Sequence, residues 1–326
     1  AYNYFRQAWI VARLHNMMRG AFDCQPILFS VPPRDTIRDV EAEGTYMAAL
    51  IAGETEAIDV LREKLTESGG YRLYATDMKR LHSENGFVAA GEPDTGGLHL
   101  VPTKLVQTRE WQIPTDDWPF LYLREPRIPL HNWRMLGLML VLSLGLVSVF
   151  SPGGRPRVNP HFFFLGAGFM LIETKSVVQS AQLFGSTWLV NSVVFAGVLV
   201  MILLANLYVL IVRPIRLWPY YAALAGTLLV SALVPLQTLL TETAGFRVAG
   251  AMLVLCAPIL FAGVIFASSF RWVQNPELAF GANIAGVVVG ALLEYSSLMI
   301  GYQRLTVVAA ILYALSLLGR PKSQEQ

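Results

Sequence analysis

The stretch WLVNSVVFAGVLVMILLANLYVLIV at residues 188–212 contains no Asp, Glu, Lys or Arg. An apolar segment of about 20 residues is long enough to cross the roughly 30 Å hydrocarbon core of a bilayer as an α-helix. The stretch therefore predicts a membrane-spanning helix.

Similar apolar stretches lie on both sides of this one, all after residue 131. Tryptophans fall at or next to several of their ends, where amphipathic rings settle at a membrane interface. The pattern predicts an α-helical transmembrane bundle of about seven helices at residues 131–326, in which the second span carries charge and the seventh is short. The predicted spans are residues 132–150, 161–183, 188–212, 218–240, 248–270, 279–301 and 304–319.

The charges divide the chain into two parts. The whole sequence is 54% hydrophobic and only 15% charged, which is too apolar for an ordinary soluble domain of this size. Residues 131–326 hold 5 of the 23 acids and 11 of the 25 bases, a net charge of +6, which leaves −4 for residues 1–130. The first 130 residues are therefore expected to form a separate, water-soluble domain.

The soluble part alternates between strand and helix patterns. Residues 1–6 indicate the end of a strand, so the chain is expected to begin within a domain, and residues 7–19 and 54–68 have apolar residues at helical spacing. The apolar run at residues 26–31 is typical of a strand buried on both faces, which we expect in a parallel sheet. This alternation predicts an α/β domain, with residues 76–100 as a polar surface loop.

Two soluble segments resemble a known family. Tyr2-Asn-Tyr-Phe-Arg6 and Thr115-Asp-Asp-Trp-Pro-Phe-Leu-Tyr122 resemble the C-terminal half of a spermidine-synthase-like domain (polyamine aminopropyltransferase-like) of the membrane-fused kind. In the bundle, Phe164-Leu-Gly-Ala-Gly-Phe-Met-Leu-Ile-Glu173, Gly281-Ala-Asn-Ile-Ala-Gly286 and Leu293-Glu-Tyr295 resemble the helices that follow that domain. The resemblance covers nearly the whole chain, but none of its motifs is a catalytic signature.

The resemblance implies a class I AdoMet-transferase-like (Rossmann-like) fold. Such a domain binds AdoMet or decarboxylated AdoMet and transfers an aminopropyl or methyl group to an amine-like acceptor. It holds the nucleotide on a Gly-rich turn after its first strand, and these residues are expected upstream of residue 1, in the same protein or in another subunit that completes the domain. Gly69-Gly70 and Gly96-Gly97 lack the GxGxxG form, and Val31-Pro-Pro-Arg-Asp35 departs from the family's substrate-side stretch. No catalytic residue is therefore assigned.

Asp116 and Asp117 form the best-defined polar motif of the soluble part. Adjacent carboxylates can bind a polyamine ammonium group or raise one another's pKa. In the other interpretation, one aspartate caps a turn before Trp118 while the other is solvated.

Polar residues in the second and sixth spans lie along one side of each helix, and small residues spaced four apart in the sixth span predict a close-packing seam. A carboxylate inside a membrane costs at least about 2.5 kcal/mol unless it is paired, protonated or open to water. We therefore predict a buried polar cluster that joins these two helices, either as structural contacts or as the lining of a path for a cation or amine. Its predicted members are Glu173, Lys175, Gln179, Gln182, Asn283 and Glu294.

Three functions remain open from the sequence. The first is an integral membrane, spermidine-synthase-like transferase whose cofactor motif lies upstream of this chain. The second is a transport or channel-like protein for a cationic or amine solute, and the third is a structural subunit of a membrane complex. The distribution of Arg and Lys near the span ends favours a soluble domain outside the cytosol. An AdoMet-type enzyme, however, needs the cytosol, where its cofactor is made. We expect the domain to lie in the cytosol.

The composition disfavours other classes of function. The soluble part is slightly acidic and has no basic patch interleaved with aromatic residues, so nucleic acid is not an expected partner. Cys24 and Cys256 are isolated, and the five histidines have no ligand spacing, so no disulfide framework and no metal site is expected.

Overall fold

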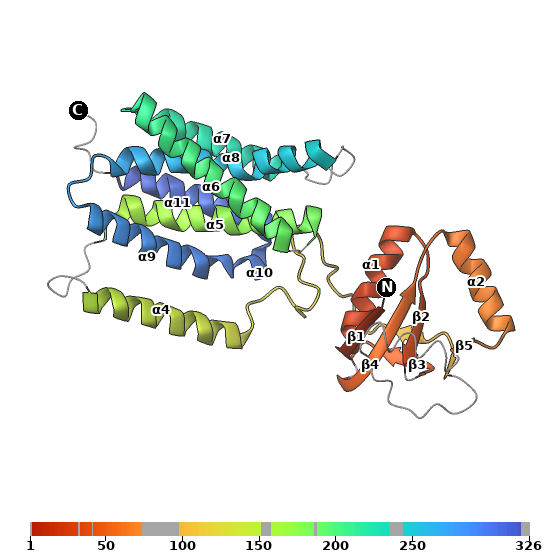
Figure 1. Cartoon of the computed structure of the whole chain (residues 1–326). Helices are drawn as coiled ribbons and strands as arrows, with labels where there is room; N and C mark the ends of the chain where they lie inside the picture. Colours follow the sequence, from red (N-terminus) through yellow and green to blue (C-terminus); the bar gives the residue numbers. More distant parts are fainter. Residues whose placement is uncertain are drawn as a thin grey trace. The chain divides into compact units, whose positions relative to one another are not determined.

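The computed structural model describes residues 2–31, 33–40, 42–73, 98–150, 158–185, 188–234 and 244–320 (Figure 1). The chain divides into two compact units. The first, called the α/β unit below, consists of Ala1–Thr115 and Pro119–Glu125. The second, called the bundle, consists of Asp116–Trp118 and Pro126–Gln326.

The α/β unit contains a three-stranded sheet with the order β1-β4-β2. β1 (Tyr2–Gln7) leads directly into helix α1 (Ala8–Phe22), which connects it to β2 (Ile27–Val31). β4 (Ala42–Ile51) is antiparallel to both strands and lies between them, so β1 and β2 run parallel without direct pairing. This is a split β-α-β arrangement. The prediction that residues 26–31 belong to a parallel sheet was wrong, because an apolar run does not reveal the direction of its neighbours and β4 had not been anticipated.

Two small strand pairs and a second helix complete this unit. β3 (Thr36–Arg38) pairs in parallel with β7 (Lys104–Val106), and β5 (Tyr71–Leu73) pairs antiparallel with β6 (Leu98–Leu100). Helix α2 (Thr55–Glu67) lies within the predicted helix at residues 54–68 and buries Ile58 and Leu65.

The predicted loop at residues 76–100 can be compared with the structure only at its end. Residues 98–100 form strand β6, so the prediction was wrong for them, and the remainder lies outside the described residues. The predicted helix at residues 7–19 is confirmed, although it begins at Ala8, continues past Gly20 and ends at Phe22, with Asp23 as its C-cap. Asp23 has a left-handed φ of 50°, a conformation that aspartate tolerates better than most residues.

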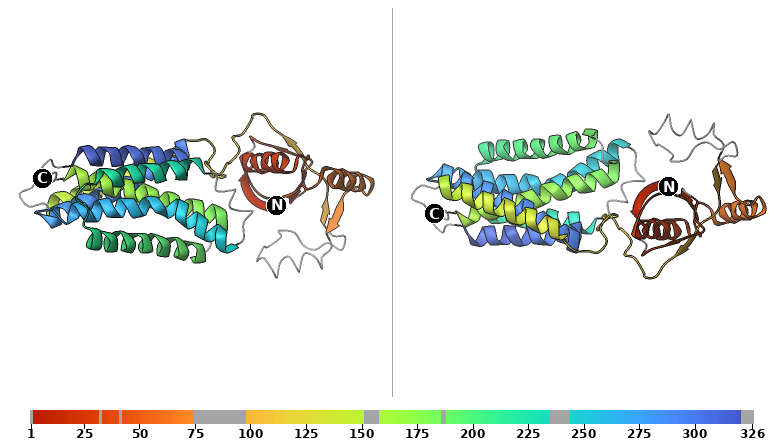
Figure 2. Two further views of the ribbon diagram at one scale, coloured as in Figure 1. Left: turned by 90° about the horizontal axis from the view of Figure 1, so that it is seen from above. Right: turned by 90° about the horizontal axis from the view of Figure 1, so that it is seen from below.

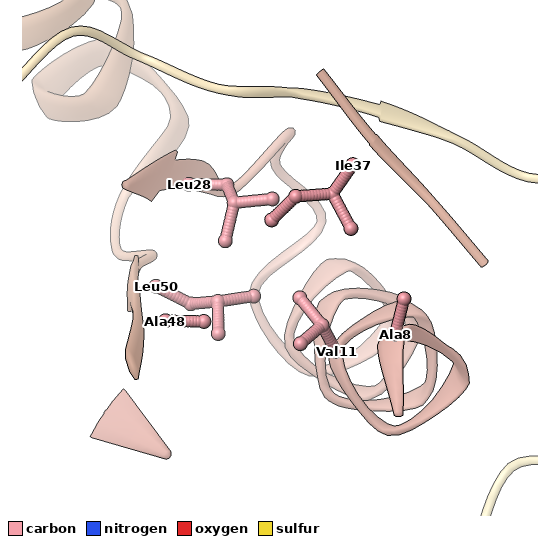
Figure 3. Packing of buried hydrophobic residues seen from close by; sticks show 6 residues of the cluster. All are labelled: Ala8, Val11, Leu28, Ile37, Ala48 and Leu50. Atoms are coloured by element: carbon pink, nitrogen blue, oxygen red, sulfur yellow. The ribbon is translucent and has the colours of Figure 1, made fainter. Parts of the chain in front are cut away.

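One of the buried clusters of the α/β unit lies between α1 and the sheet. Figure 3 shows Leu28 and Leu50 of the sheet pointing towards Val11 of α1. Complete burial of such side chains contributes about 1.5–3 kcal/mol each relative to exposure. The buried cluster consists of Ala8, Val11, Leu28, Ile37, Ala48 and Leu50.

The regular elements described in the bundle are all helices, and its long helices run side by side along a common direction (Figure 2). A helix is present in each of the stretches that the sequence predicted as spans. The helices are α4 (Leu130–Phe150), α5 (Pro160–Phe184), α6 (Trp188–Val212), α7 (Trp218–Leu233), α8 (Ala244–Phe270), α9 (Pro276–Glu294), the short α10 (Ser297–Ile300) and α11 (Tyr302–Leu318).

Four segments in the described part of the chain are long and apolar enough to cross a membrane, judged by length and composition. They are Pro160–Phe184, Asn191–Val212, Gly250–Phe270 and Pro276–Ile300. The apolar helices α7 and α11 are shorter. Seven crossings therefore remain a prediction.

Helices α5 and α9 pack with their backbones in close contact. A Cβ atom added at Gly286 would collide with the carbonyl oxygen of Phe163, and one at Gly290 would lie 2.5 Å from the carbonyl oxygen of Ala167. A Cβ at Gly166 of α5 would likewise collide with the carbonyl oxygen of Asn283. The predicted close-packing seam is confirmed at Gly286 and Gly290, where only hydrogen fits between the helices.

Candidate functional site

A buried lysine lies at the centre of one polar site of the bundle. Lys175 of α5 is only 4% exposed. Its Nζ donates to Thr306 Oγ1 of α11 at 2.5 Å and to Ser231 Oγ of α7 at 3.2 Å, with the Ser231 carbonyl oxygen at 3.5 Å. Thr306 and Ser231 are themselves buried, so one ammonium group connects three helices away from solvent.

The Lys175 site adjoins a cavity of about 10 Å³. Leu171, Leu228 and Leu305 form apolar walls of the cavity. Pro258 of α8 adds its apolar ring, and as a proline it has no backbone N–H to donate. Ser176 also lines the cavity and directs its hydroxyl to the carbonyl oxygens of Ile172 at 2.8 Å and Leu255 at 3.0 Å. The ammonium group therefore faces a small, mostly apolar space.

A line of polar side chains on α5 leads from Lys175 towards the end of that helix. Gln179 follows one turn later and is 8% exposed, and its Oε1 has no hydrogen-bond partner within the described residues. Gln182 is exposed, and its Nε2 donates to the carbonyl oxygen of Asp116 at 2.9 Å. Asp117 lies close enough to Lys175 to interact with it electrostatically.

Asp117 lies at the N-terminus of α11. Its Oδ1 accepts a hydrogen bond from the backbone N–H of Gln303 at 2.5 Å, and its carbonyl oxygen accepts one from Tyr302 N at 2.9 Å. The next residue, Trp118, donates from Nε1 to the carbonyl oxygen of Leu298 at 2.8 Å. Of the two interpretations of the Asp116-Asp117 pair, this geometry favours capping, although the cap serves a helix distant in sequence rather than a local turn.

The conformation of Gly301 permits this contact. Gly301 has φ 85° and ψ 171°, a region that is essentially restricted to glycine. A Cβ atom there would also lie 2.5 Å from Asp117 Oδ2. The carboxylate can reach the first turn of α11 because position 301 has no side chain.

The structure does not bring the six predicted cluster members together. Asn283 donates from Nδ2 to the Phe162 carbonyl oxygen at 3.1 Å, which ties α9 to the N-terminal half of α5. Glu173 and Glu294 are partly buried, and their side-chain carboxylates have no hydrogen bond or ion pair within the part of the chain that the structure describes. The predicted cluster on the α5–α9 seam must be corrected, because Lys175 turns towards α7 and α11 instead.

A second buried network was missed by the sequence analysis. His161 of α5 is fully buried, with Nδ1 2.9 Å from the Ser316 carbonyl oxygen and Nε2 2.8 Å from Ser269 Oγ. Tyr221 OH lies 3.0 Å from Ser316 Oγ. Because a carbonyl oxygen can only accept, the neutral ring carries its proton on Nδ1 and accepts at Nε2. The network ties α5 to α7, α8 and α11. The signal that could have revealed it was a histidine inside an apolar span, where a polar ring needs partners.

In the α/β unit, Asp39 is 1% exposed and organises the segment after β7. Its carboxylate accepts hydrogen bonds from Thr108 Oγ1 at 2.7 Å, Thr108 N at 2.9 Å, Trp111 Nε1 at 2.8 Å and Arg109 N at 3.4 Å. Burial alone would raise the pKa of Asp39, but the hydrogen bonds from Thr108, Trp111 and Arg109 together hold it below its ordinary value.

Arg13 of α1 is fully buried and binds the segment at residues 119–125. Its guanidinium donates to the carbonyl oxygens of Leu121 at 2.9 Å, Leu123 at 2.5 Å and Arg124 at 2.9 Å. Burial, and secondly the positive charge of Arg109, lowers the pKa of Arg13 below its ordinary value. The contacts with carbonyl oxygens give Arg13 a structural role that its position in an amphipathic helix did not predict.

No cofactor cradle and no metal centre can be assigned to the described residues. Gly69 and Gly70 have positive φ values and form the turn after α2, while Gly96 and Gly97 lie outside the described part. No three His, Cys, Asp or Glu side chains gather into a group that could hold a metal ion anywhere in the described ranges. In comparison with known proteins, no family model, no curated protein and no solved structure matches the chain.

Proposed function

We propose that the chain is the membrane-embedded part of a spermidine-synthase-like transferase. In this proposal the α/β unit contributes to a domain that binds AdoMet or decarboxylated AdoMet and transfers a group to an amine-like acceptor. The bundle holds that domain at a lipid bilayer, and the domain faces the cytosol, where the cofactor is made.

The observation that supports the proposal most is the split β-α-β arrangement. β1 and β2 run parallel and are connected by α1, so their carboxyl ends, at Gln7 and Val31, point towards the same edge of the sheet. In open α/β sheets, ligands bind in the crevice outside the carboxyl ends of the parallel strands. This edge is therefore where the proposal expects donor or acceptor to bind.

The membrane part of the proposal is supported by the apolar surface of α6. Leu203, Leu210 and Ile211 of this helix are exposed by 66, 68 and 71%. A monomeric soluble protein rarely exposes a large continuous apolar patch, whereas lipid solvates one. The segment Asn191–Val212 is long enough for one crossing.

Isothermal titration of the purified complete protein tests the cofactor. We expect saturable binding of AdoMet or decarboxylated AdoMet with a micromolar Kd, which corresponds to about −8 kcal/mol. ATP is the control, because it contains the same adenosine but lacks the sulfonium group. Equal binding of all three ligands, or binding of none, would reject the transferase.

A further inference from the structure

The charge of Lys175 lacks a direct counterion. The ammonium group is buried, and no carboxylate forms an ion pair with it within the described residues. Asp117 interacts with it from a greater distance, and that carboxylate is already held by the backbone N–H of Gln303. An uncompensated charge in a low-dielectric interior is strongly unfavourable, so an additional negative group beside Lys175 would stabilise the bundle.

The two hydroxyl groups at Lys175 can also donate to such a group. Ser231 Oγ and Thr306 Oγ1 both accept a hydrogen bond from Nζ. Each hydroxyl has one further proton to donate, and neither forms another hydrogen bond with a described residue. Lys175, Ser231 and Thr306 all line the same cavity. The ammonium group and these two hydroxyls are therefore three donors that line one cavity. Ser176 contributes a further hydroxyl to the cavity wall.

The size of the space limits what can bind. A cavity of about 10 Å³ has room for one small particle, a water molecule or a single monatomic ion. Sulfate, phosphate and carboxylates exceed this size, as does the headgroup of a lipid. Leucine side chains at positions 171, 228, 255 and 305 surround the polar groups and strengthen the attraction between opposite charges.

We propose that Lys175, Ser231 and Thr306 form a binding site for one monatomic anion, chloride. The anion neutralises the buried ammonium and accepts hydrogen bonds from the two hydroxyls, and it thereby joins α5, α7 and α11. Thr306 lies about one turn inside the N-terminus of α11, and Gln179 and Gln182 continue the polar line from the site to that end of the bundle. The site is independent of the proposed transferase activity.

Thermal unfolding of the complete protein in detergent tests the site. Sodium gluconate is replaced stepwise by sodium chloride, and in a second series by sodium bromide, at constant ionic strength. Because the ionic strength is constant, it cannot explain a difference between the salts. Gluconate is too large for the cavity and is therefore the anion that does not bind there. We expect saturating halide to raise the thermal midpoint by about 5 °C, as expected for a ligand that binds only the folded state.

Two variants and one control locate the effect. Thr306→Val keeps the side-chain shape but removes a donor, and Lys175→Met removes the charge. Both are expected to lose the halide-dependent shift. Thr227→Val is the matched control and should keep the shift, because among the described residues the Thr227 hydroxyl bonds only to the Leu224 carbonyl oxygen of its own helix.

Two results would overturn the proposal. Equal midpoints in chloride and gluconate for the unmodified protein would mean that the cavity holds at most water. A halide shift that persists in Thr306→Val or in Lys175→Met would place the anion elsewhere. If Lys175→Met does not fold, the nearly isosteric Thr306→Val variant still decides between these outcomes.

Discussion

The carboxylate of Asp117 accepts a hydrogen bond from the backbone N–H of Gln303 at 2.5 Å, although 186 positions separate the two residues. The first N–H groups of a helix have no partner within the helix, and a negative charge beside them is stabilised by the helix dipole. A residue from before the first bundle helix thus caps the last one.

Replacing Asp117 with Ala is expected to destabilise the bundle by about 1 kcal/mol, since the change removes a helix cap. The thermal midpoint in detergent, followed by circular dichroism, measures the loss. Asp116→Ala is the neighbouring control, because that side chain is exposed and surface contacts are worth little. An equal loss in both variants would argue against the specific cap.

Gly286→Ala is expected to separate α5 from α9, because the added methyl group collides with the carbonyl oxygen of Phe163. We expect a loss of about 1–3 kcal/mol, typical of overpacking. Gly281→Ala is the matched control on the same helix, where an added Cβ meets no atom within 4 Å. The control should be neutral or slightly stabilising, because alanine favours helix over glycine. The reverse order of the two midpoints would refute the packing described for α9.

The stability of the α/β unit is expected to fall in acid through Asp39. Its pKa is held below the ordinary value, so the carboxylate contributes stability above about pH 4, and this contribution is lost as the pH falls through the folded-state pKa. Asp39→Asn should cost about 2 kcal/mol at pH 7, and the difference from the unmodified protein should shrink towards pH 3. Thermal midpoints measured between pH 7 and pH 3 check this, and a constant difference would contradict it.

The side of the membrane occupied by the α/β unit can be tested by cysteine labelling. Cys24 and Cys256 are both buried, so the unmodified protein should react weakly with a membrane-impermeant maleimide and serves as the control. Glu63→Cys adds an exposed thiol on α2. We expect labelling of this variant only after the cells are opened. Labelling of intact cells would place the unit outside the cytosol and contradict the proposed orientation.

Local patterns predicted the helices but not the sheet. Both α1 and α2 followed from apolar residues at helical spacing, which is a property of a single segment. β4 was missed because Met47-Ala-Ala-Leu-Ile51 has no alternation and is rich in good helix formers. It becomes a strand because β1 and β2 supply hydrogen-bond partners on both sides, and such a tertiary effect overrides local propensity.

The sequence by itself predicted a different solvent for each of the two parts of the chain. The charge-free stretch at residues 188–212 is apolar and long enough to cross a bilayer. Helical spacing placed Lys175, Ser176, Gln179 and Ser180 on one side of α5, where all four are buried. Only the tertiary structure decided the partners of these groups. Ser231 and Thr306 lie 56 and 131 positions from Lys175, and a helical period shows which way a side chain points but not which helix lies there.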